Sequence, residues 1–185
     1  MLLINPEISS LPASLMFADI AKLVLFPGVM AFAACSDLLT MTISNRVSIV
    51  LLAGFLLLAM MSGMELRELA SHLGAGCSVL IVAFALFTRG WVGGGDAKLA
   101  VATAIWLGFD HLLVYLVYAS LFGGALTLLL LQFRLLPLPP ALVHQQWIER
   151  LHRHNGDVPY GIALAAAAVA VYPQTRWMVS IGLPS

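Results

Sequence analysis

The sequence contains few charged residues and almost no cysteine. Only 10% of its 185 residues are charged, and nine acidic side chains balance nine lysines and arginines. A chain without excess basic charge lacks the field that attracts nucleic acid, so we expect no nucleic-acid partner. The two cysteines, Cys35 and Cys77, have no CxxC spacing and lie in apolar runs. We therefore predict two small buried side chains, with no metal site, no disulfide framework and no cofactor.

Hydrophobic residues, in contrast, make up 61% of the chain, a share far above that of soluble domains. A helix needs about 17–25 apolar residues to cross roughly 30 Å of hydrocarbon. Six runs approach this length, the fourth only with its flanks: 20–36, 47–62, 69–87, 97–109, 112–133 and 158–172. We predict an all-α, polytopic protein of the lipid bilayer, a single domain over residues 1–185 with about six transmembrane helices.

The basic residues between these runs predict an orientation, because lysine and arginine concentrate on the cytoplasmic side of a membrane. Three lie on one side of the predicted bundle, namely Lys22, Arg67 and Arg176, and six on the other, namely Arg46, Arg89, Lys98, Arg134, Arg150 and Arg153. Loops 37–46, 88–96 and 134–157 are then cytoplasmic, with both termini outside. Asp37 and Asp96 consequently face the same aqueous compartment, whereas Asp110 marks an external turn.

Some segments allow two interpretations. Residues 141–154 form either an amphipathic helix in the interface, with Trp147 at headgroup depth, or a plain tether after a proline-rich stretch. The pair Gly123-Gly124 is either a hinge or a close-packing site. Asp157 is a helix-start residue or a substrate contact. Trp91 and Val92 either border a site or anchor their loop in the interface.

The two acids of the cytoplasmic loops are the candidates for chemistry. Taken singly, Asp96 is explained as a helix N-cap, and Asp37 as an acid that reaches water at the membrane boundary. Taken together, two carboxylates can share one proton, so that one activates a water and the other protonates a carbonyl oxygen. The helix dipole favours negative charge at Asp96, which begins a helix, over Asp37, which ends one. This assigns the resting base to Asp96 and the acid to Asp37, with roles that swap during turnover.

The residues around Asp96 suit a site that admits a peptide. Gly93, Gly94 and Gly95 lack a Cβ, so a substrate backbone can approach closely. A phosphate-binding loop is disfavoured, because no strand precedes the glycines and no GKS/T follows them. Lys98 either tunes the acid or extends its amine to the interface.

Three segments carry a resemblance to a known family. They are Gly93-Gly94-Gly95-Asp96-Ala97-Lys98-Leu99, Asp37 followed at eight residues by Asn45, and Val158-Pro159-Tyr160-Gly161. The first resembles the GxGD signature of the type IV prepilin peptidases, which are membrane aspartic proteases. The second is similar to the family's first catalytic aspartate with its Asp...Ile-Pro-Asn loop, and the third to the Pro-Tyr-Gly start of its last helix. The resemblance covers about residues 18–172.

The resemblance implies a peptidase of the bacterial inner membrane, with Asp37 and Asp96 as its catalytic pair. Its substrates would be prepilins or pseudopilins, cut at the cytoplasmic face just before their hydrophobic segment, and the pilus assembly machinery is a further implied partner. Ser44 stands where the family has proline, which leaves the rigidity of that loop open. The zinc-binding insertion of longer members is missing. The chain therefore resembles the short form associated with Flp/Tad-type pili, for which N-methylation is not implied.

Two alternatives remain. A preflagellin peptidase-like GxGD protease shares the two aspartates but differs in substrate. A non-enzymatic transport or assembly subunit would use its acids as a proton or cation path. Such a path needs acids near the middle of the membrane, and no predicted span carries one at its centre.

Overall fold

The computed structural model describes residues 13–137, 145–153, 156–179 and 181, and it confirms the predicted all-α membrane protein, because these residues contain helices and no strand. The elements are α1 (Ala13–Thr40), α2 (Asn45–Met61), α3 (Leu66–Thr88), α4 (Gly94–Leu135), α5 (Gln146–His152), α6 (Tyr160–Val171), the 3-10 turn η2 (Tyr172–Gln174) and α7 (Arg176–Val179). Three described helices are long and apolar enough to span a membrane, α1 from Phe17, α3 and α4, while 45–61 and 160–174 are shorter apolar helices.

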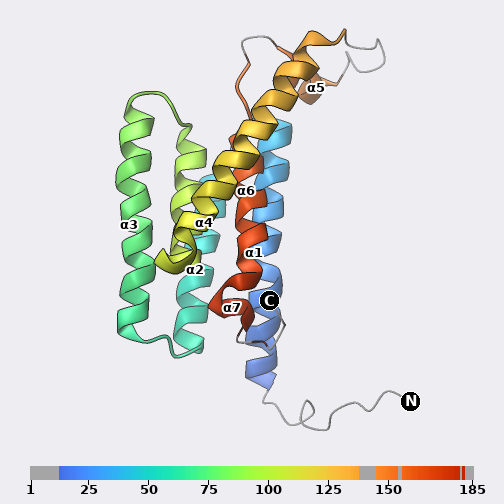
Figure 1. Ribbon diagram of the computed structural model, residues 1–185. Helices are drawn as coiled ribbons and strands as arrows, with labels where there is room; N and C mark the ends of the chain where they lie inside the picture. The colour runs from blue at the N-terminus through green and yellow to red at the C-terminus, as the bar shows by residue number, and fades with distance from the viewer. Residues whose placement is uncertain (1–12, 138–144, 154–155, 180, 182–185) are drawn as a thin grey trace, which may run out of the picture.

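Helix α4 consists of two limbs that run in opposite directions and correspond to the fourth and fifth predicted spans. It breaks at Gly108, where φ is 67° and ψ is 178°. In Figure 1 the first limb runs down to this turn and the second limb, from yellow to orange, runs back up. The first limb, residues 94–107, is about 20 Å long at 1.5 Å per residue. It is therefore shorter than the roughly 30 Å of hydrocarbon that a full span must cross.

Side chains from other helices make the break at Gly108 tolerable. The break removes helical partners from carbonyls in the preceding turn, and an unpaired carbonyl inside a bilayer costs several kcal/mol. His72 Nδ1 lies 2.7 Å from the Ile105 carbonyl oxygen, so this nitrogen carries the proton. Trp177 Nε1 donates to the Trp106 carbonyl at 2.9 Å. Glycine is needed at 108 because φ is positive and a Cβ would lie 3.0 Å from the His72 ring.

A cluster of aromatic rings fills the space next to this turn. Phe26 stacks on Tyr172 with 4.5 Å between ring centroids, and Trp106 lies 5.0 Å from Phe26 and 5.4 Å from Trp177. The Trp106 indole donates to the Leu51 carbonyl at 2.9 Å. Such ring pairs contribute about 0.5–1.5 kcal/mol beyond the burial of their surface. The cluster thus joins α1, α4, η2 and α7 in one packed core.

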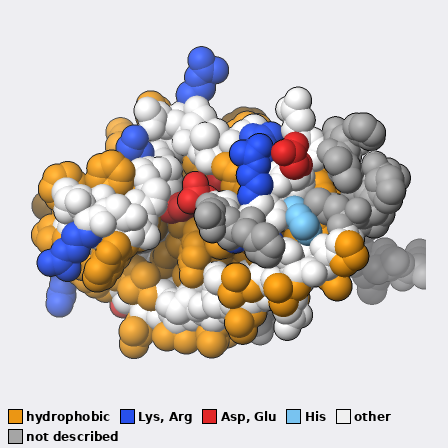
Figure 2. Space-filling view, turned by 90° about the horizontal axis from the view of Figure 1, so that it is seen from above, with side chains coloured by type: hydrophobic (Ala, Val, Ile, Leu, Met, Phe, Trp, Pro, Cys, Tyr) orange, Lys and Arg blue, Asp and Glu red, His pale blue; other side chains and the backbone are white. Residues whose placement is uncertain are grey.

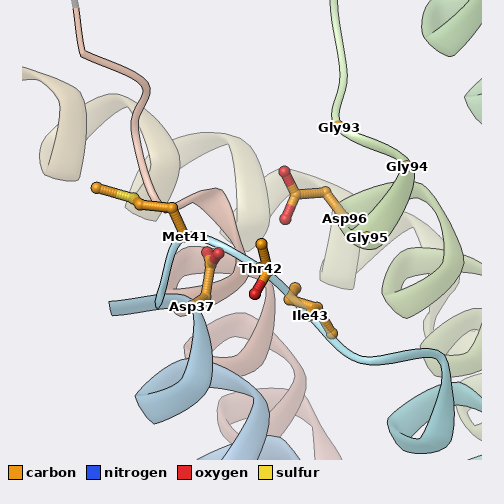
Figure 3. A pocket seen from close by; sticks show the side chains of 8 residues that line it. All are labelled: Asp37, Met41, Thr42, Ile43, Gly93, Gly94, Gly95 and Asp96. Carbon is orange, nitrogen blue, oxygen red and sulfur yellow. The ribbon is translucent and has the colours of Figure 1, made fainter. Parts of the chain in front are cut away.

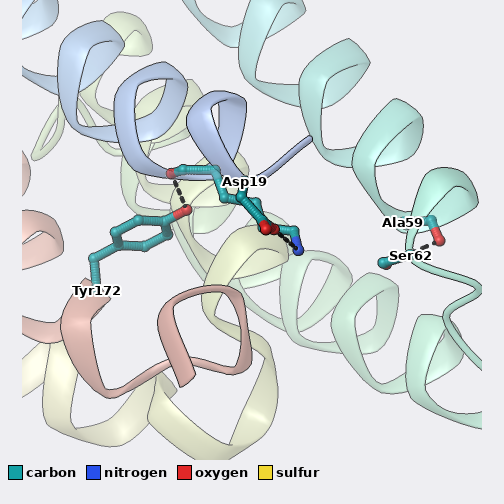
Figure 4. Close-up of polar contacts among 5 residues, drawn as sticks. Asp19, Ala59, Ser62 and Tyr172 are labelled. Carbon is teal, nitrogen blue, oxygen red and sulfur yellow. Dashed lines mark hydrogen bonds and ion pairs between the residues drawn. The ribbon is translucent and has the colours of Figure 1, made fainter. Parts of the chain in front are cut away.

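Polar groups near the end of the bundle that carries the α2–α3 turn bond to close neighbours (Figure 4). Lys22 Nζ donates to Asp19 Oδ1 at 3.0 Å, and the Tyr172 hydroxyl donates to the Lys22 carbonyl at 2.8 Å. Ser62 Oγ donates to the Ala59 carbonyl at 3.2 Å. Glu68 and Arg176 form an ion pair that joins α3 to α7. The Tyr172–Lys22 bond and the Glu68–Arg176 ion pair fasten helix ends to one another, whereas the other two bonds are local.

The prediction that Cys35 and Cys77 are buried is wrong, since both are free and exposed. The outer surface also carries large apolar side chains, among them Leu113 at 73% and Phe84 at 63% exposure. In a soluble protein such side chains would be costly, but on a membrane protein the outer surface meets lipid rather than water. A small apolar side chain such as that of cysteine can therefore face lipid instead of being buried in the core.

The segments predicted to share one aqueous side do lie together. The loops after α1 and α3 and the connection from α4 through α5 to α6 are at the same end of the bundle (Figure 1). Helix α5 buries Ile148 and Leu151, and Arg150 Nη2 donates to the Leu39 carbonyl at 2.9 Å. The predicted 141–154 segment is thus helical over 146–152 and docked on α1, while 141–144 and 154 lie outside the described residues.

Candidate active site

Asp37 and Asp96 line one cavity at this end of the bundle. The cavity has a volume of about 310 Å³ and lies between the end of α1, the α1–α2 loop and the start of α4. Its walls are Asp37, Met41, Thr42, Ile43, Gly93, Gly94, Gly95 and Asp96. Figure 3 shows the two carboxylates directed into the same space from opposite walls. Chain segments about sixty residues apart thus bring two acids to one hollow.

Asp37 is held by the start of another helix. Its side chain is buried in the last turns of α1, and the backbone N–H of Gly161 in α6 donates to Asp37 Oδ2 at 2.7 Å. Asp37 therefore lies at the C-terminal end of α1 and also at the N-terminal end of α6. Two helix ends of opposite polarity thus meet at Asp37, so the helix dipoles do not by themselves make Asp96 the more acidic of the two carboxyl groups. The bond engages Oδ2 as an acceptor and leaves Oδ1 as the oxygen suited to a shared proton.

Gly161 is required for this contact because no side chain fits between α6 and α1. A Cβ at this position would lie 2.7 Å from both Asp37 Oδ2 and Ile43 Cδ1. The preceding Pro159 is buried, and the ring of Tyr160 packs where a Cβ on Gly123 would stand. Residues 159–161 therefore form a close-packed support for Asp37.

Asp96 enters the cavity from the first turn of α4. The N-cap of α4 is Gly93, so the simple explanation of Asp96 as the cap is wrong. Its position in the first turn still places it where the helix dipole favours negative charge. A Cβ on Gly95 would lie 3.2 Å from the Ile43 Cβ and 3.4 Å from the Ile43 backbone nitrogen. The absence of that Cβ lets α4 begin directly against the α1–α2 loop.

The α1–α2 loop is shaped by residues at its two ends. Met41 has a φ of 54°, a left-handed conformation uncommon for a side chain of this kind, and its N–H donates to the Asp37 carbonyl at 2.8 Å. Ser44 has a φ of −64°, the value that proline would impose, and its Oγ accepts from the Arg46 N–H at 3.3 Å. The serine thus keeps a proline-compatible backbone and also caps α2.

A side-chain hydrogen bond joins the first residue of α2 to the start of α4. Lys98 Nζ donates to Asn45 Oδ1 at 2.7 Å, although 53 positions separate them in the sequence. From the sequence, Lys98 is expected either to tune the acid or to extend to the interface. The bond ties the helix that carries Asp96 to the start of α2, the helix that follows the loop after Asp37.

Comparison with known families identifies the chain. The sequence model of the type IV leader peptidase family matches residues 24–128, more than half of the chain, and both aspartates fall within the match. The chain belongs to the type IV leader peptidase family. It is accordingly a leader peptidase-type protease, of a family whose members are aspartic peptidases. Neither the curated proteins nor the solved structures provide a match.

The family match of this leader peptidase ends before Pro159-Tyr160-Gly161, so it is the structure that shows these residues beside Asp37. Arg134 lies just beyond the match too, and sequence reasoning used it only to predict orientation. It is 6% exposed, and it donates through Nε to the Leu151 carbonyl at 2.8 Å and through Nη2 to the Gly156 and Asp157 carbonyls at 2.9 and 3.0 Å. Arg134 therefore shapes the segment that delivers Gly161 to Asp37.

Trp91, Val92 and Asp157, for which the sequence allowed two interpretations each, line a second, larger hollow that adjoins the cavity. Over the described residues, no group of three or more His, Cys, Asp or Glu side chains is arranged to hold a metal ion. The carboxyl groups of Asp37 and Asp96 are the acidic groups that line the cavity.

Proposed function

We propose that the protein is a membrane aspartic endopeptidase that removes the leader peptide from type IV prepilin-like substrates, including pseudopilins. The observation that carries this proposal is the meeting of Asp37 and Asp96 in one cavity of a type IV leader peptidase-family chain. A Flp/Tad-type prepilin is the substrate that the short form of the sequence favours.

The proposed mechanism needs one proton shared by the pair. The ionised carboxylate takes a proton from a water molecule as the water oxygen bonds to the scissile carbonyl carbon, and the protonated carboxyl donates its proton to the carbonyl oxygen. A proton then passes to the amide nitrogen as the C–N bond breaks, which releases an acid and an amine. Asp37 is the positioned member, since Gly161 fixes its Oδ2. One of the two carboxyl groups is ionised at rest and acts as the base, while the other carries the shared proton.

We place the site at the cytoplasmic face of the bacterial inner membrane. Support comes from the basic residues Arg46, Arg89, Arg134 and Arg150, which lie in or next to the segments at the dyad end of the bundle. A leader peptide cut here would be released on the side of the membrane where the prepilin is made, and the processed protein would pass to the pilus assembly machinery.

Processing of a prepilin co-expressed with the peptidase tests this function. We expect Asp37→Asn and Asp96→Asn each to abolish the size shift that marks leader loss, because acid–base catalysis contributes about 10²–10⁴-fold and Asn cannot exchange a proton. Glu149→Gln, which alters an exposed acid of α5 at the same end and lines neither the cavity nor the adjoining hollow, is the matched control and should still process. Cleavage that survives both dyad substitutions at normal membrane abundance contradicts the proposal.

A further inference from the structure

A groove of about 1020 Å³ continues from the dyad cavity between α3, the second limb of α4 and α6. The cavity and the groove share Asp37, Met41, Gly93 and Asp96 as lining residues, so they form one connected space. Seen from the dyad end, acidic side chains lie beside a depression whose floor is hydrophobic (Figure 2). The groove thus leads from the reactive acids into the apolar part of the bundle.

Each long wall of the groove is one face of a helix. On α3 the face consists of Ser78, Val82 and Leu86, and on α4 of Leu112, Leu116, Ser120 and Gly124, all at intervals of four residues. The serine hydroxyls donate to carbonyls of their own helices, Ser78 to Gly74 at 2.9 Å and Ser120 to Leu116 at 2.8 Å. Because these donors are already used, the walls present apolar surface and suit an apolar occupant.

The two adjacent glycines of α4 show which side of the helix is left open. A Cβ on Gly123 would overlap the Tyr160 ring, whereas a Cβ on Gly124 would meet nothing within 4 Å. Gly123 therefore packs against α6, and Gly124 borders empty space in the groove. Small residues such as Gly124, Ser120 and Ser78 are those that let another helix approach closely inside a membrane.

We propose that this groove binds an apolar helical segment of the substrate, directly continuous with the scissile peptide, during cleavage. The inference rests on the proposed function, since a peptide held at the dyad must continue somewhere, and the groove begins at the same aspartates. Its length suits the occupant, because Leu112 and Gly124 are about 18 Å apart along α4 at 1.5 Å per residue. A helical segment of about 12 residues spans this length at 1.5 Å per residue.

Cross-linking to uncleaved substrate tests the groove without requiring turnover. The peptidase would carry Cys35→Ser and Cys77→Ser to remove its own thiols and Asp96→Asn to stop cleavage. A cysteine placed by Ser120→Cys faces the groove, and one placed by Leu121→Cys, at a side chain 62% exposed, faces outward. With a prepilin that carries single cysteines along its apolar segment, we expect several-fold higher cross-linking from position 120. Equal yields from the two positions, as when lipid fills the groove, overturn the proposal.

Cleavage kinetics separate this proposal from the proposed function. In the active enzyme, Ser120→Trp should slow cleavage of a full prepilin but not of a short soluble peptide that spans only the cleavage site, and Leu121→Trp should slow neither. The groove proposal fails if Ser120→Trp slows cleavage of both substrates alike, or of neither. Cleavage of the prepilin by the wild type would then still support the proposed function. If the wild type cleaves no prepilin, the proposed function itself fails and the groove proposal with it.

Discussion

The two ends of the first limb of α4 differ sharply in how they are packed. At Gly108 aromatic rings and buried donors fill the space around the turn, and His72 and Trp177 bond to the carbonyls that the break releases. At the other end, the limb begins with glycines and Asp96 at the wall of an open cavity. The same short helix is thus anchored at one end and presents an acid at the other. This comparison suggests that the turn maintains the fold and that the dyad end performs the chemistry.

The packed end should be the most sensitive to truncation of a ring. Trp106→Ala removes a fully buried indole that contacts Phe26 and Trp177 and donates to Leu51, so we expect a loss of about 3–5 kcal/mol in the free energy of unfolding. Trp91→Ala, at a side chain 71% exposed, should change stability little. Thermal unfolding in detergent compares the two, and similar losses would contradict the distinction between the ends.

At the dyad end, a single methyl group should affect cleavage more than folding. Gly161→Ala places a Cβ against Asp37 and Ile43, and a displacement of about 1 Å at a reacting group can slow an enzyme about 10²-fold. Gly28→Ala is the matched control, because a Cβ there meets nothing within 4 Å. Prepilin cleavage rates and melting temperatures are the measurements. Unchanged cleavage by Gly161→Ala would show that the bond to Asp37 does not position the acid.

Arg134 should affect both stability and cleavage, because it supports the segment that leads to Gly161. Arg134→Met leaves three backbone carbonyls without their donor, and we expect a loss of about 1–3 kcal/mol in stability together with slower cleavage. Arg153→Met changes an exposed arginine paired with Glu149 and should have little effect on either. Full activity in Arg134→Met would separate this loop from the site.

The smallest expected effect concerns the exposed bond between Lys98 and Asn45. Lys98→Ala, Asn45→Ala and the double variant form a cycle whose coupling in the free energy of unfolding should be about 1 kcal/mol or less. Because the bond joins the start of α4, which carries Asp96, to the start of α2 at the end of the loop that follows Asp37, each single variant should slow cleavage modestly and the double no further. Independent, multiplying losses in cleavage rate would show that the two side chains act separately.

Composition and apolar run length predicted the helical membrane fold, and they placed α2 and α3 within a few residues of their observed bounds. They also placed the reversal within α4, since the predicted turn near Asp110 lies two residues from the break at Gly108. Of the two interpretations of Gly123-Gly124, close packing holds for Gly123, which packs against the Tyr160 ring. The donors from α3 and α7 that support the break come from distant segments, so no local pattern contains them.

The candidate site likewise has a part that local motifs reveal and a part that depends on contacts between distant segments. The glycine run and the two acids are visible as local motifs, so Asp37 and Asp96 were candidates before their geometry was known. The bonds from Gly161 to Asp37 and from Arg134 to the carbonyls before α6 join distant segments. An arginine next to an apolar run signals only membrane orientation, because its backbone partners are set by the tertiary fold.

The most direct test of the two-aspartate account is the prepilin cleavage rate of Asp37→Asn, Asp96→Asn and the double variant, purified at equal folded amounts. Groups that act in one chemical step are not additive, so we predict that each single substitution removes nearly all activity and that the double variant is no slower. A double variant whose loss equals the product of the two single losses, or a single variant that retains cleavage, would contradict a shared catalytic pair.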